Sequence, residues 1–231
     1  MVNLNIPNPP PELTYSQFED FRNRAILRAN GISLSEVELI AALTKERNVL
    51  QAAAAHTLGS LSSRAATPIL KDLLSSSEDL VKVEAAFALA RLGVREGKDA
   101  LVQCLSYSVD AYLFPAIAAG YLAQLDDPQG FNTIINCLNV DIPPIRVLAC
   151  KQLYFFVRFQ GRPNKGRDSI DVYGLFDRAL KDHGTDIQWQ ALVQLREIRS
   201  PESKSLLERY VETAQDERLC DIAREILASF A

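Results

Sequence analysis

The segment VKVEAAFALARLG, residues 81–93, decides the fold of this chain. Its apolar residues recur at intervals of three and four, which predicts an amphipathic helix that ends at a glycine. The same pattern stands 31 residues earlier in AAAAHTLGSL, residues 52–61, where Leu58 occupies the position of Leu89. Self-similarity at such an interval is typical of a repeat protein.

The pattern continues to the end of the chain. Leu122 follows Leu89 by 33 residues, and small residues precede a leucine or isoleucine again in 147–156, 190–198 and 221–230. Each unit is too small to bury its own apolar face and must stack on its neighbours. Strand-like alternation is absent from the sequence. We therefore expect an all-α fold, an α-solenoid of about six stacked helical hairpins that forms a right-handed superhelix.

Small residues mark one face of each of these helices. Side chains of this size let neighbouring helices approach to the short end of the usual axial separation of about 8–10 Å. The residues concerned are Ala54, Ala55, Ala85, Ala86, Ala118, Ala119, Ala149 and Ala191.

The unit VxxxAAxALxxLG followed by xxAxxxLxxxL resembles a HEAT repeat, in the short variety called phycobilisome-lyase-like HEAT repeats. Residues 81–93 match this pattern best, and the resemblance extends over about 35–231. Pro115 departs from it, because the repeat usually has arginine there. The resemblance implies the fold but no single activity, since such repeats occur in lyases, scaffolds and chaperones.

The chain is expected to form one solenoid domain with two additions. Residues 1–15 are rich in proline and should be extended. A single HEAT-like domain should follow over 16–231, with a capping helix over 16–30 that ends at Gly31 and an inserted basic loop over 158–172.

Composition excludes several classes of protein. The net charge is −4, without a block of like charges, so non-specific binding to nucleic acid is not expected. No segment is long and apolar enough to cross a membrane and no signal peptide is evident, which predicts a cytoplasmic protein without membrane insertion. Four cysteines without a CxxC pair and two histidines predict buried free thiols and no metal site.

The stretch RFQGRPNKGRDSIDVYG, residues 158–174, interrupts the repeats. Its glycines have the spacing of a phosphate-binding loop, but Arg167 stands where that motif needs lysine and no strand precedes it. Two interpretations are open, a tolerated surface loop and a basic contact for an acidic partner. The basic residues of the loop are Arg158, Arg162, Lys165 and Arg167.

In HEAT repeats that resemble this one, the alanine-bearing helix lines the concave surface. That resemblance implies a partner-binding groove, and several of its residues are apolar, as at binding sites. The alternative is that these side chains pack between repeats. No partner for catalysis stands within one turn of His56, so a solvated or capped imidazole is expected. The candidate groove residues are His56, Glu84, Phe87, Arg91, Ile117, Gln124, Lys151, Phe155, Trp189, Val193 and Glu197.

The leading hypothesis is a non-enzymatic scaffold or adaptor that binds another protein in its concave groove, with no catalytic residue and no cofactor. A DNA-repair glycosylase would need a basic groove, and Arg91 and Lys151 are offset by acidic residues. The resemblance also implies an alternative, a lyase-like or chaperone-like protein that handles bilins on phycobiliproteins. The partner is expected to be another protein, with a phycobiliprotein and a second HEAT-repeat subunit as candidates. Under the alternative, a linear tetrapyrrole could stack on Tyr112, Tyr121, Tyr154, Phe155 and Trp189.

Overall fold

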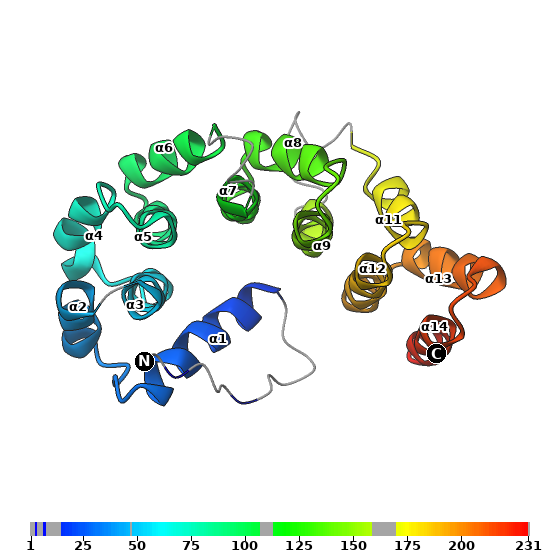
Figure 1. The fold of residues 1–231 in the computed structure, drawn as a ribbon, viewed down its shortest axis with the longest axis horizontal. Coiled ribbons are helices and arrows are strands. Elements are labelled where there is room, and N and C mark those ends of the chain that lie inside the picture. Colours follow the sequence, from blue (N-terminus) through cyan, green and yellow to red (C-terminus); the bar gives the residue numbers. More distant parts are fainter. Residues whose placement is uncertain are drawn as a thin grey trace. The chain divides into compact units, whose positions relative to one another are not determined.

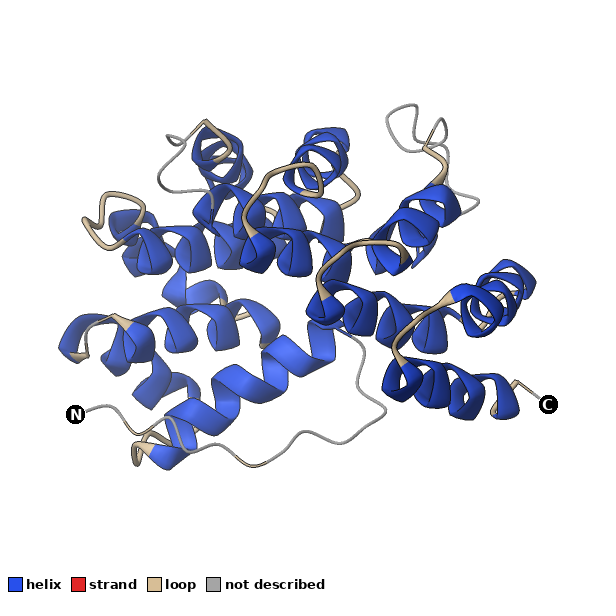
Figure 2. Cartoon of the chain, turned by 45° about the vertical axis from the view of Figure 1, so that its right-hand side comes forward, coloured by secondary structure: helices blue, strands red, loops and turns tan. Residues whose placement is uncertain are grey.

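The computed structural model describes residues 3, 7, 15–46, 48–106, 113–158 and 170–230. In these ranges every regular element is a helix, as the colouring of Figure 2 shows, which confirms the predicted all-α class. The chain divides into two compact units, Met1–Leu125 and Asp126–Ala231. The single domain expected over 16–231 stays a prediction.

The first unit consists of one separate helix and a row of helical hairpins (Figure 1). The separate helix is α1 (Tyr15–Ala29), and Gly31 follows it with a φ of 77°. A short 3₁₀ turn, η1 (Arg64–Ala66), precedes the second hairpin. The hairpins pair α2 (Glu36–Lys45) with α3 (Val49–Ser60), α4 (Thr67–Leu73) with α5 (Asp79–Arg91), and α6 (Arg95–Cys104) with α7 (Leu113–Gln124).

The second unit repeats this arrangement. A short helix, α10 (Tyr154–Arg158), follows its first hairpin. The hairpins pair α8 (Pro128–Cys137) with α9 (Pro143–Gln152), α11 (Val172–Leu180) with α12 (Thr185–Ile198), and α13 (Pro201–Thr213) with α14 (Glu217–Ala228). The described ranges thus contain six successive hairpins, and the predicted α-solenoid is confirmed.

Side-chain caps at several hairpin helices explain where these helices begin. The Asp127 side chain accepts a hydrogen bond from the backbone N–H of Gln129, and the Ser200 side chain accepts one from Ser203. Asp216 does the same at the start of α14. Such caps satisfy backbone donors that the first helical turn leaves without a partner.

Small residues bring the alanine-bearing helices into close contact, as expected. All eight alanines of the predicted thin faces are completely buried. One such close contact is at Gly59 of α3, where an added Cβ would lie 2.7 Å from Cα of Ala88 on α5. A side chain larger than hydrogen at this position would therefore push the two helices apart.

The position of α1 matters most for the candidate site. This helix packs on α3, and Figure 1 shows it on the side of α3 that is turned away from α2. Its residues Ile26 and Leu27 join the same buried cluster as Leu58 and Leu89. The helix therefore covers a face of the alanine-bearing helices, which we call the inner face of the first unit.

Other expectations concern thiols, metals and membranes. The four cysteines are free and buried, as predicted, and burial raises the pKa of Cys137 to about 11. Across the described ranges, no cluster of three or more histidine, cysteine and acidic side chains could bind a metal ion. In the same ranges, no helix combines the length and hydropathy that a membrane crossing requires.

Candidate functional site

On the inner face of the first unit, side chains that the sequence suggested as an exposed apolar strip are buried. The exposed fractions of His56, Glu84 and Phe87 are only 2%, 6% and 1%. Phe87 stacks on Tyr121, with ring centroids 3.8 Å apart and planes 5° from parallel, and the Arg91 guanidinium lies 5.5 Å from the centroid of Phe87. The interpretation of Phe87 as an exposed anchor is therefore wrong, because its ring packs between helices.

A buried histidine links three helices beneath this surface. Nδ1 of His56 on α3 lies 2.8 Å from Oε2 of Glu84 on α5, and Nε2 lies 2.9 Å from Oδ1 of Asp20 on α1. Burial opposes a charge on the imidazole, but the two carboxylates outweigh it and raise the pKa of His56 to about 9. At neutral pH the ring is an imidazolium that donates to both acids.

The two carboxylates have further partners. Tyr121 on α7 donates its hydroxyl hydrogen bond to Glu84, and Ser60 donates to Asp20. Arg91 donates to the Ser60 hydroxyl over 3.0 Å, and its Nη1 atom lies 3.5 Å from the Asp20 carboxylate. Burial opposes ionisation of Asp20, but bonds from His56 and Ser60 prevail and lower its pKa to about 2. The carboxylates of Asp20 and Glu84 therefore lie beside two basic groups, those of His56 and Arg91.

We call this arrangement the Asp20–His56–Glu84 network. The expectation of a solvated or capped imidazole at His56 is wrong, because carboxylates reach it from helices that lie far away in the sequence. Sequence reasoning missed Asp20 for the same reason. The sequence did contain a usable signal. His56 stands between the alanine run 52–55 and Leu58, all of which are buried, and a buried histidine requires a polar partner.

The geometry of the Asp20–His56–Glu84 network favours a role in holding α1 over a role in catalysis. Each atom of the imidazole that could transfer a proton already bonds to a carboxylate, and the ring is almost completely buried. Replacement of one member would leave a buried charge without its partner, which is costly. The arrangement therefore specifies where α1 lies on α3 and α5.

The remaining groove candidates of the first unit lie on α7. Ile117 is half-buried and packs against the cluster that contains Phe87. Gln124 is also half-buried, and its Nε2 atom has no hydrogen-bond partner among the described residues. Neither side chain forms part of an exposed apolar surface.

In the second unit the candidates separate into buried and exposed. Phe155 is completely buried, so its assignment to a binding surface is wrong. Trp189 is 44% exposed, and Val193 and Glu197 are half-buried at intervals of four residues along the same side of α12. Lys151 is half-buried on α9, which packs beside α12. We call Trp189, Val193, Glu197 and Lys151 the α12 face.

The two charged residues of the α12 face differ in their ion pairing. Oε1 of Glu197 lies 3.2 Å from the guanidinium of its neighbour Arg196. Lys151 forms no ion pair with any residue that the structure describes. The face therefore presents an aromatic ring, an aliphatic side chain and a lysine ammonium group that is available to a carboxylate.

Two further sets of candidates can be placed only in part among the described residues. Among the aromatic residues expected to stack on a pigment, Tyr121 and Phe155 are buried and cannot do so, and Tyr112 lies outside the described residues. In the basic loop, Arg158 ends α10. The residues Arg162, Lys165 and Arg167 lie outside the described residues.

Comparison with known proteins supports the repeat type. The family model of HEAT repeats matches residues 36–113, from the first residue of α2 to the first residue of α7. The repeat type that the sequence pattern suggested is thereby confirmed for this part of the chain. A search of curated proteins found no significant match.

Several solved structures are similar to this chain at low sequence identity. A designed armadillo repeat protein is 14% identical with a TM-score of 0.50, over 84% of this chain and 99% of that one. The complex of CpcE and CpcF of phycocyanin lyase from Nostoc sp. PCC7120 is 18% identical with a TM-score of 0.48, over 98% and 97%. An engineered protein is 18% identical with a TM-score of 0.48, over 84% and 97%. The match to the designed armadillo repeat protein supports a helical-repeat fold, and an identity this low shows no shared activity.

Proposed function

Because this chain is a HEAT-repeat protein, we propose that it is a non-enzymatic binding module whose partner is another protein. Repeats of this type stack into extended surfaces, and such surfaces bind partners. The surface proposed here is the α12 face of the second unit.

The observation that carries the proposal is the exposure of Trp189. Among the described residues it is the only aromatic side chain with large apolar exposure, at 44%. Tryptophan is enriched among residues that dominate binding energies, because one side chain contributes a large rigid contact area. A ring that is left this exposed on a helix face supports a contact with a partner.

The neighbours of Trp189 indicate the chemistry of that partner. Val193, one turn further along α12, extends the apolar contact. The available ammonium group of Lys151 favours a carboxylate opposite it. The partner surface should therefore combine apolar side chains with at least one acidic residue.

The described polar residues support binding better than catalysis. The best-connected polar group in the first unit is the Asp20–His56–Glu84 network, in which His56 and Glu84 are buried and bound to α1 through Asp20. We also propose a cytoplasmic location, which the four free buried cysteines support, since disulfides are rare in reducing compartments.

The test is affinity capture from a lysate of the source cell with three forms of the protein. Wild type is compared with Trp189→Ala and with Leu61→Ala, a matched control because Leu61 is 46% exposed in the first unit. We expect wild type and Leu61→Ala to retain the same protein, and Trp189→Ala to lose it with unchanged helicity. The purified partner should bind Trp189→Ala at least about tenfold more weakly.

Two results would change the conclusion. Equal capture by Trp189→Ala and wild type would exclude the α12 face as the binding surface. A visible absorbance band that copurifies with wild type would favour the bilin-handling alternative, in which Trp189 contacts the pigment. Capture of a phycobiliprotein or of a second HEAT-repeat subunit would identify that protein as the partner.

A further inference from the structure

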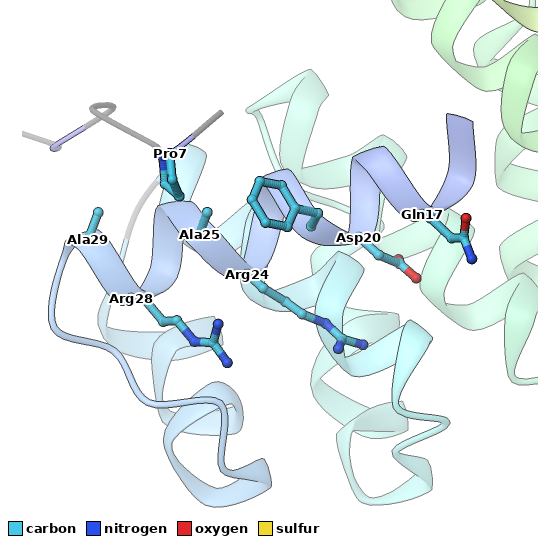
Figure 3. A pocket seen from close by; sticks show the side chains of 8 residues that line it. Pro7, Gln17, Asp20, Arg24, Ala25, Arg28 and Ala29 are labelled. Carbon is cyan, nitrogen blue, oxygen red and sulfur yellow. The ribbon is translucent and has the colours of Figure 1, made fainter. Parts of the chain in front are cut away.

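A second surface, independent of the α12 face, runs along α1 (Figure 3). It is a groove of about 600 Å³ within the first unit. Its lining comes from one side of α1 and from Pro7 of the N-terminal segment. The lining residues are Pro7, Gln17, Asp20, Phe21, Arg24, Ala25, Arg28 and Ala29.

Two arginines in this groove lack acidic partners. Neither Arg24 nor Arg28 forms an ion pair with any residue within the described ranges, although acidic residues outnumber basic ones in the chain. The Nε atom of Arg24 is buried and has no hydrogen-bond partner there. By contrast, Arg22 on the same helix lies 3.3 Å from Glu19. A buried guanidinium N–H without an acceptor is costly, and neither guanidinium group has an acidic side chain beside it in the described ranges.

Asp20 does not supply that anion. Figure 3 shows Asp20, Arg24 and Arg28 projecting from the same side of α1. The Asp20 carboxylate, however, already accepts hydrogen bonds from His56 and Ser60. Its charge is compensated within the Asp20–His56–Glu84 network, and the two arginines keep their positive charge available to a ligand.

The dimensions of the groove indicate an extended peptide. From Gln17 to Ala29 it follows α1 for about 18 Å, at 1.5 Å per helical residue. About five residues of extended chain have the same length. Arg24 and Arg28 are separated by about 6 Å along the helix axis. Alternate residues of an extended chain lie on one side at about 6.8 Å, so two acidic residues separated by one residue would match the arginines.

We propose that this groove binds an extended acidic segment of a partner protein. Arg24 and Arg28 each bind one carboxylate of an acidic pair in which one residue separates the two acids. The planar guanidinium favours such carboxylate pairing, often through two parallel hydrogen bonds. Phe21, which is half-buried in the groove, contacts an apolar side chain that flanks the acidic pair.

The experiment measures fluorescence anisotropy of a labelled peptide with the sequence Leu-Glu-Ser-Glu-Leu against the full chain. One control peptide replaces both acids with glutamine, and a second places the two acids side by side. The protein variants are Arg24→Gln, Arg28→Gln and the matched control Arg22→Gln, whose side chain pairs with Glu19 instead of lining the groove.

We expect saturable binding that Arg24→Gln and Arg28→Gln each weaken by about tenfold, while Arg22→Gln leaves it unchanged. The peptide with adjacent acids should bind more weakly and the glutamine peptide should not bind. Added salt should weaken binding, because the contact is ionic. Arg28 is exposed, so its variant should fold even if the half-buried Arg24 proves necessary for stability.

Three results would overturn the proposal. These are the absence of saturable binding, equal weakening by Arg22→Gln, and equal affinity for the glutamine peptide. None of them bears on the α12 face, which lies in the other unit and is tested with a different variant.

Discussion

Nε2 of His56 lies 2.9 Å from Oδ1 of Asp20, and this ion pair joins α1 to the first alanine-bearing helix. The same imidazole holds Glu84 of the next hairpin through its other nitrogen atom. A helix that precedes the hairpins is therefore tied to two of them through one buried side chain.

Replacement of His56 by alanine should destabilise the first unit. The change leaves Asp20 and Glu84 as anions without their shared cation. Loss of one partner from a buried ion pair typically lowers the free energy of unfolding by about 3–5 kcal/mol. Urea denaturation measures this loss, and hydrogen exchange should show early opening of α1.

The control for this experiment is Arg22→Ala, which removes an ion pair from the exposed side of α1 and should cost at most about 1 kcal/mol. Equal stability of His56→Ala and wild type would contradict the role assigned to the Asp20–His56–Glu84 network.

Stability should fall in alkaline solution because of the same histidine. The folded-state pKa of His56 is about 9, above the usual value of 6.5 for an unfolded chain. A group with a raised pKa stabilises the folded state fully below pH 6.5, and this contribution is lost as the pH rises through 9. The slope in that interval should approach at most about 1.4 kcal/mol per pH unit.

Urea midpoints between pH 6 and pH 9.5 test this expectation. His56→Gln is the control variant, since glutamine keeps hydrogen-bonding capacity but does not titrate in that range. A wild-type slope that persists unchanged in the variant would assign the pH dependence to other groups.

Gly59→Ala should destabilise the protein although alanine is the better helix former. Helix propensity alone favours alanine over glycine by about 1 kcal/mol. The new Cβ, however, would lie 2.7 Å from Cα of Ala88, and overpacking of this kind costs about 1–3 kcal/mol. The melting temperature should fall, and a rise would show that α3 and α5 can separate without cost.

Trp189 provides a direct optical test of the α12 face. It is the only tryptophan of the chain and is 44% exposed, so its fluorescence should be readily quenched by acrylamide. Binding of the captured partner should shift the emission to shorter wavelength and protect the ring from quenching. Unchanged emission on saturation with the partner would place the contact elsewhere.

The fold could be predicted from local patterns. The recurrence of Leu58, Leu89 and Leu122 with alanine pairs before them indicated helices that stack in sequence, and six hairpins follow in the described ranges. Neighbouring hairpins contact each other, so the pattern of one repeat carries most of the information about its packing.

The candidate site could be predicted only in part. Trp189 is exposed as expected, but Phe87 and Phe155, which were candidates for the same groove, are buried. The difference arises because Phe87 meets the ring of Tyr121 from another hairpin, whereas Trp189 extends beyond its neighbours. Position within a repeat does not specify the size of the side chains that other helices bring against it.

The sequence by itself determined the helical class, the hairpin repeat and the buried small-residue faces, because these depend on periodicity over one or two turns. Only the tertiary structure decided that α1 lies on α3, that Asp20 and Glu84 meet at His56, and that Arg24 and Arg28 line a groove. The contacts of His56 join residues from separate helices, and Asp20 and His56 lie 36 residues apart in the chain. Their pairing depends on the packing of whole helices, which local periodicity does not encode.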